Sequence, residues 1–159
     1  MPLTKDISTF LQGAEANFKK DGYLLSVLIS FGERTEVIAC PFHDVEDKDV
    51  FEQFLLDRLA TGKTTEFVFL SETWIARQTD GAEEFLREHG SLENFPGREE
   101  AAIAVHSCPD EEVCYTASIQ RGDDVRLDEW VSLETKTPFN PFHSQRFGAL
   151  WQRAKAGSN

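Results

Sequence analysis

The sequence predicts an α+β fold: a largely antiparallel sheet of five to six strands, covered by helices, in the order α-β-β-α-β-(α)-β-β-β-α. Two observations predict it. Most of the strand-like apolar runs are joined by turn-sized links, which favours hairpins. Amphipathic helical patterns open and close the chain, while no series of βαβ units indicates a parallel sheet. A chain of 159 residues is expected to form one domain over residues 1–159.

The first half of the chain predicts two helices, a hairpin and a long strand. Apolar residues recur at three- and four-residue steps from Ile7 to Phe18, as one face of a helix requires. Gly32 lies in the short link between two runs rich in Leu, Val and Ile, which is typical of a hairpin turn. Gly62 ends the second helical stripe. The predicted elements are a helix over 4–20, strands over 23–31 and 35–40, a helix over 47–61 and a strand over 65–76.

Residues 77–99 interrupt this pattern with a polar excursion that contains a short helix around 82–88. Its large apolar residues are few, and Phe85, Leu86 and Phe95 are the expected anchors. A segment with little apolar area to bury opens easily, so we expect this excursion to be the most mobile internal part of the chain.

The second half adds strands and a closing helix. Strands are predicted over 101–107, 113–120 and 125–133, followed by a proline-containing extended connector over 137–143. The closing helix, 144–155, carries an apolar stripe with Trp151. We expect this helix to dock on the domain or on a second copy of it.

The composition indicates a soluble acidic protein and excludes several classes. Its 28 acids and 16 bases give a net charge of -12, and no acid follows Glu134. Such a charge repels nucleic acid phosphates and anionic lipids, so neither is an expected partner. The acidity fits an ordinary soluble surface, or a DNA mimic or mask for a basic partner. No signal peptide or spanning segment is expected, and three cysteines favour a reducing cytoplasm over a disulfide framework.

The sequence contains imitations of catalytic motifs but no complete one. Gly62-Lys63-Thr64 imitates the end of a phosphate-binding loop, but it leads from a helix into a strand, the reverse of the required order. The paired His-x-Glu and Pro-Cys-x-x-Cys segments of zinc deaminases do not occur. No cofactor is therefore predicted.

A loose metal cluster can be assembled from His106, Cys108 and Cys114, joined by Cys40 or His43. Zinc requires four such ligands within reach, and this spacing matches no familiar finger or ribbon. Because free cysteine is among the most buried residue types, core packing is the favoured interpretation, and no metal is predicted.

The far end of strand 65–76 is the strongest candidate site. Ser71, Glu72 and Trp74 are grouped there, where sites are often placed on open sheets. With Trp151, they are the predicted binding residues. Alternation along the strand places Glu72 and Trp74 on one face with Val68 and Leu70.

Glu72 is also the weak candidate for catalysis, with His106 and Arg98 as possible partners. A carboxylate beside a Trp can have a raised pKa and serve as an acid or base. The alternative is a structural ion pair between Glu72 and Arg77 or Arg98.

The segments Phe69-Leu-Ser-Glu-Thr-Trp74 and Arg98-Glu-Glu-Ala-Ala-Ile-Ala-Val105 resemble a group of uncharacterised bacterial and phage proteins, in which a strand ends in Ser-Glu-x-Trp. That resemblance implies no activity. By element order alone, the chain is similar to roadblock and profilin-like domains. Its size and acidity are similar to those of dimeric secretion chaperones. Both analogies imply dimeric interaction modules.

The sequence therefore favours a small acidic cytoplasmic interaction domain that is non-enzymatic and self-associating, with a protein or a second copy of itself as partner. The alternative is a hydrolytic or nucleotide-related enzyme that uses Glu72 at the strand end.

Overall fold

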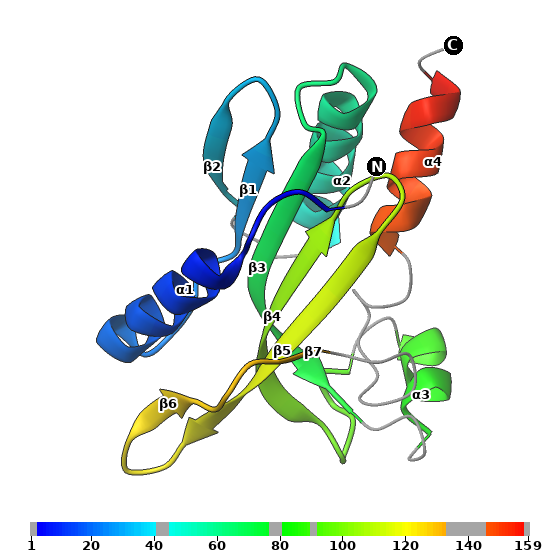
Figure 1. Cartoon of the computed structure of the whole chain (residues 1–159). Helices are drawn as coiled ribbons and strands as arrows, with labels where there is room; N and C mark the ends of the chain where they lie inside the picture. The colour runs from blue at the N-terminus through cyan, green and yellow to red at the C-terminus, as the bar shows by residue number, and fades with distance from the viewer. Residues whose placement is uncertain (1–2, 41–44, 77–80, 90–91, 133–145, 158–159) are drawn as a thin grey trace.

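The fold is seen in a computed structural model that describes residues 3–40, 45–76, 81–89, 92–132 and 146–157. In these residues a curled antiparallel sheet of seven strands carries four helices, which confirms the predicted fold class (Figure 1). The elements are α1 Ser8–Asp21, β1 Val27–Phe31, β2 Thr35–Ala39, α2 Val45–Ala60, β3 Glu66–Ile75, α3 Ala82–His89, β4 Glu99–Ser107, β5 Glu112–Arg121, β6 Val125–Leu127, β7 Val131–Ser132 and α4 Arg146–Gly157.

The sheet has the strand order β2-β1-β3-β4-β5-β6, and β7 pairs with β5. Every pairing is antiparallel. β3 and β2 both flank β1, so α2 is the crossover that carries the chain from one side of β1 to the other. The long β3 and β4 form the centre of the sheet, and β2 forms one of its edges (Figure 1).

The two faces of the sheet have separate cores because side chains alternate along β3. Phe67 and Phe69 face α2 and α4 and pack in a cluster with Leu55, Leu150 and Trp151. Val68 and Leu70 face α1 and pack with residues that include Ile7, Ala14 and Ile29. A third, smaller cluster joins α3 to the end of β3 and contains Ala76, Ala82, Leu92 and Phe95.

Two predicted boundaries move where carboxylates of β3 accept backbone N–H groups. α1 begins at Ser8 rather than near Thr4, since the N–H groups of Thr4 and Lys5 donate to Glu66. β1 begins at Val27 rather than at residue 23, and the N–H of Leu24 donates to Glu72.

The predicted strand over 125–133 is divided into β6 and β7. The predicted connector 137–143 and the start of the closing helix at 144 lie outside the described residues. None of the helices in the described parts of the chain has the length and apolar character needed to span a membrane.

Candidate functional site

The structure places the predicted strand-end residues in contacts within the fold. Ser71 is buried, and its hydroxyl lies 2.7 Å from that of Ser26. Oε1 of Glu72 accepts a hydrogen bond of 2.7 Å from the N–H of Leu24. Oε2 of Glu72 lies 3.7 Å from the guanidinium of Arg121, which makes Glu72 part of an ion pair. The carboxylate therefore holds the segment after α1 against the sheet.

Arg121, at the end of β5, connects three elements at this point. Its Nε donates to Glu100 at 2.7 Å, and its Nη1 donates to the carbonyl of Gly22 at 3.2 Å. Its guanidinium also lies 6.0 Å from the ring centroid of Phe18. Among the described residues, the base that pairs with Glu72 is thus Arg121, which the sequence reasoning did not select.

Of the other proposed partners of Glu72, Arg77 lies outside the described residues, and Arg98 and His106 have different contacts. Arg98 stacks over the ring of Trp74, with its guanidinium carbon 4.8 Å from the ring centroid, and donates to the carbonyl of Phe95. His106 is on the same sheet face as Glu72, but Glu72 pairs with Ala102, four residues from His106 along β4. That spacing corresponds to about 13 Å, beyond direct proton transfer.

His106 instead contacts Glu66, a residue that sequence reasoning missed. Nε2 of His106 lies 2.6 Å from Oε2 of Glu66, and the two residues are 3% and 5% exposed. Glu66 also accepts hydrogen bonds from the hydroxyl and N–H of Thr4 and from the N–H of Lys5. The available signal was the alternation of β3, which places Glu66 on the buried face with Val68.

Hydrogen bonds keep the Glu66 carboxyl ionised at neutral pH. Burial raises the pKa of this carboxyl, but hydrogen bonds from Thr4, His106 and Lys5 lower it by more, to about 2. Glu66 is thus an ionised acceptor at neutral pH, and Nε2 of His106 carries the proton between them. The pair holds the N-terminal segment across the sheet and is shielded from solvent, which is a structural role.

The weak metal candidates are not gathered at one point. Cys114 pairs with Val105 and faces α2 and α4, whereas His106 faces the opposite side of the sheet. All three cysteines are buried and form no disulfide. Burial raises the pKa of the Cys40 thiol to about 11 and that of Cys114 to about 12. His43 lies outside the described residues, within which no three His, Cys, Asp or Glu side chains gather as metal ligands.

Trp151 is an anchor of the core. It is stacked on Phe67 with ring centroids 5.8 Å apart, and its Nε1 donates to the hydroxyl of Ser107 at 2.9 Å. With Leu150 and Ala154 it attaches α4 to the core, while the side chain of Phe147 lies outside the described part.

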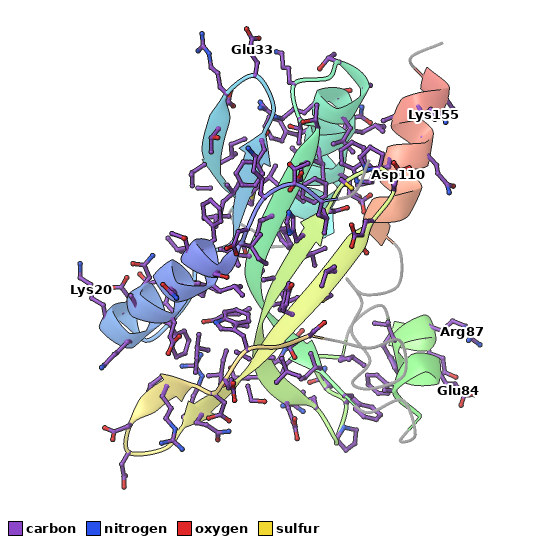
Figure 2. The ribbon with its side chains drawn as sticks, in the orientation of Figure 1. Lys20, Glu33, Glu84, Arg87, Asp110 and Lys155 are labelled. Carbon is purple, nitrogen blue, oxygen red and sulfur yellow. The ribbon has the colours of Figure 1, made fainter. Side chains whose placement is uncertain are left out.

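A cleft of about 460 Å³ opens beside α4. Asp110 from the turn after β4 and Lys155 from α4, both labelled in Figure 2, contribute its charged groups. Its other described lining residues are Leu59, Gly62, Thr64, Thr65, Pro109, Trp151, Gln152 and Ala154. The described lining includes neither cysteine nor histidine.

The outer side of β2 is an open backbone edge of the sheet. Among the described residues, no strand pairs with its outer side (Figure 1). Val37 of β2 is 69% exposed. Arg58 of α2 donates to Glu36 at 2.9 Å and also to Ser30 and Thr64. The single charge of β2 is thereby paired within the chain.

Exposed apolar side chains also lie on α2. Val50 and Phe54 are exposed. Val50, Phe54 and Arg58 follow one another at four-residue steps and therefore form one stripe along the helix. The guanidinium of Arg58 lies 5.7 Å from the ring centroid of Phe54. Because Arg58 reaches Glu36, this stripe of α2 is the one turned toward β2. We call the open edge of β2 and the exposed apolar residues beside it the β2 surface. It consists of the outer backbone of β2, Val37, Val50 and Phe54.

Comparisons with protein-family models, with curated proteins and with solved structures find no match to this chain. Function is therefore inferred from the site itself.

Proposed function

We propose that this chain is a non-catalytic protein-interaction domain that binds an extended segment by adding it as a strand to the β2 surface. The observation that supports this function is the open edge of β2, flanked by exposed apolar side chains on both sheet faces. Strand addition uses backbone hydrogen bonds for affinity and side-chain contacts on alternate faces for specificity.

The sequence of β2 lacks the usual protection of an edge. Edge strands are commonly guarded by Lys, Pro, a bulge or short length, because an open edge recruits other strands. Thr-Glu-Val-Ile-Ala contains neither Lys nor Pro, and its single acid is paired with Arg58. At the other end of the sheet, β6 has three residues and follows Asp123 and Asp124. Among the described strands, β2 thus offers an open edge of five residues whose single charge is paired.

The flanking apolar groups give the surface two sides. Val37 pairs with Ile29, so its side chain lies on the α1 face of the sheet. Val50 and Phe54 belong to α2, which covers the opposite face. An added strand directs alternate side chains to the two faces and can cover both groups at once. Burial of such side chains contributes about 1.5–3 kcal/mol each when complete.

The partner class follows from charge and from the contacts of the titratable groups. A net charge of -12 favours a protein partner over nucleic acid or an anionic lipid surface. Both oxygens of Glu72 contact groups of the fold, so no described contact supports the alternative of an enzyme that uses this carboxylate. The buried cysteines, which form no disulfide, are in keeping with a cytoplasmic location.

Selection of binding peptides from a random displayed library tests this function. We expect the selected peptides to be extended and to alternate apolar residues with a period of two. Val37→Lys places a charge on the β2 surface and should abolish their binding. Val131→Lys is the matched control, because Val131 is another exposed strand valine, at β7. Failure of the monomeric chain to select any peptide, or equal loss in both variants, would overturn the proposal.

A further inference from the structure

We infer that the segment added to β2 is the β2 strand of a second copy, paired antiparallel about a twofold axis that passes beside Val37. This inference rests on the proposed function and names its partner. Three features of the chain support it: the direction of the backbone groups of β2, the self-complementarity of its side chains, and the exposed stripe on α2.

The hydrogen-bonding direction of β2 follows from one contact. The N–H of Cys40 donates to the carbonyl of Ser26 at 2.8 Å, so the backbone groups of Cys40 point toward β1. In an antiparallel pair this direction alternates with each residue. The N–H and C=O groups of Thr35, Val37 and Ala39 therefore point outward. These are also the three exposed residues of β2.

The outward residues are symmetric about Val37. When a second β2 pairs so that Val37 lies opposite its own copy, Thr35 lies opposite Ala39 of the second copy, and Ala39 opposite Thr35. Each such pair can exchange two backbone hydrogen bonds, giving about six across the interface. A twofold interface of this kind is self-complementary, as closed homodimers require.

The inward residues fit the same register. Glu36 lies opposite Ile38 of the second copy rather than opposite another acid, and like charges directly opposite destabilise a strand pair. The Arg58–Glu36 ion pair keeps the local charge low. The Val37 pair places two β-branched side chains together, an arrangement that favours strand pairing.

The α2 helices add a second contact. Because Arg58 marks the stripe turned toward β2, Val50 and Phe54 of each copy face the twofold axis. Joining the sheets brings the two stripes over the same face, where they can bury each other. The twofold arrangement therefore covers the apolar groups of the β2 surface on both sheet faces.

Cysteine cross-linking tests the register. The three native cysteines are buried, so an added thiol on β2 is the accessible one. Under mild oxidation, Val37→Cys should give a disulfide-linked dimer, because paired strand Cα atoms lie about 5.5 Å apart. Thr35→Cys alone should not link, whereas an equal mixture of the Thr35→Cys and Ala39→Cys variants should. Linking of Thr35→Cys alone at the same rate as Val37→Cys would overturn the register.

Sedimentation velocity tests the second copy as the partner. The unmodified chain and Val131→Lys should sediment as dimers, and Val37→Lys as a monomer with an unchanged far-UV spectrum. A chain that is monomeric at all concentrations but still binds selected peptides through Val37 would overturn this inference and leave the proposed function standing. A monomer that binds no peptide would overturn both.

Discussion

Nε2 of His106 and Oε2 of Glu66 lie 2.6 Å apart between β4 and β3, in a position almost closed to solvent. The contact joins two central strands to the N-terminal segment, because the same carboxylate accepts the N–H groups of Thr4 and Lys5. A buried charge needs compensating partners, and Glu66 accepts hydrogen bonds from Thr4 and Lys5 and contacts His106. It therefore links the stability of the fold to pH.

Glu66→Gln should destabilise the fold at neutral pH and remove part of its acid sensitivity. The pKa of Glu66 falls from 4.5 to about 2 in the fold. At about 1.4 kcal/mol per tenfold change in proton affinity, this shift corresponds to a stabilisation of the folded state by roughly 3 kcal/mol. Because the folded-state pKa is the lower one, this stabilisation is complete above the ordinary pKa and is lost as pH falls toward 2.

Urea unfolding at a series of pH values measures this effect. The free-energy difference between wild type and Glu66→Gln should be largest at pH 7 and should shrink as the pH is lowered through the pKa range of carboxyl groups. Glu15→Gln, at an exposed position of α1, is the control and should change stability little. A difference that stayed constant down to acid pH would contradict the role given to Glu66.

Gly32→Ala should destabilise the fold because the β1–β2 turn packs closely on the turn before β3. A Cβ at residue 32 would overlap the backbone carbonyl of Lys63, which cannot move as a flexible side chain can. Overpacking of this kind costs about 1–3 kcal/mol. Gly122→Ala, in the β5–β6 turn, has no heavy atom within 4 Å of the added Cβ and should leave the melting temperature nearly unchanged. Equal melting temperatures for the two variants would refute the close approach.

The fold was predictable because its main signals are local. Alternation along β3 correctly separated Phe67 and Phe69 from Val68 and Leu70, and turn residues marked the hairpin ends. Glu66 and Arg121 were missed because their partners are far apart in the sequence: His106 is forty residues from Glu66. The open edge of β2 likewise depends on strand order, which periodicity does not specify.

Trp151→Phe should separate the hydrogen bond of Trp151 from its packing. The smaller ring keeps much of the stacking on Phe67 but leaves the hydroxyl of Ser107 without its indole donor. A cost of about 1–3 kcal/mol is expected from the lost hydrogen bond, and about 3–5 kcal/mol for Trp151→Ala. Lys155→Ala, at an exposed position of α4, should cost at most about 0.5 kcal/mol. If removal of all residues after Asn140 left the unfolding free energy unchanged, α4 would not stabilise the domain.

The amides of α3 should exchange with solvent faster than those of β3 and β4. This eight-residue helix packs in a small cluster with Leu92 and Phe95, apart from the two large cores. The rings of Phe85 and Phe95 make an edge contact, with their centroids 5.3 Å apart. So small an apolar cluster should open locally at a lower free energy than global unfolding. Residue-resolved hydrogen exchange measures this opening, with α2 as the reference helix because its Leu55 and Leu59 lie in the main core. Protection of Phe85 and Leu86 as strong as that of β4 would show instead that α3 opens only with the whole domain.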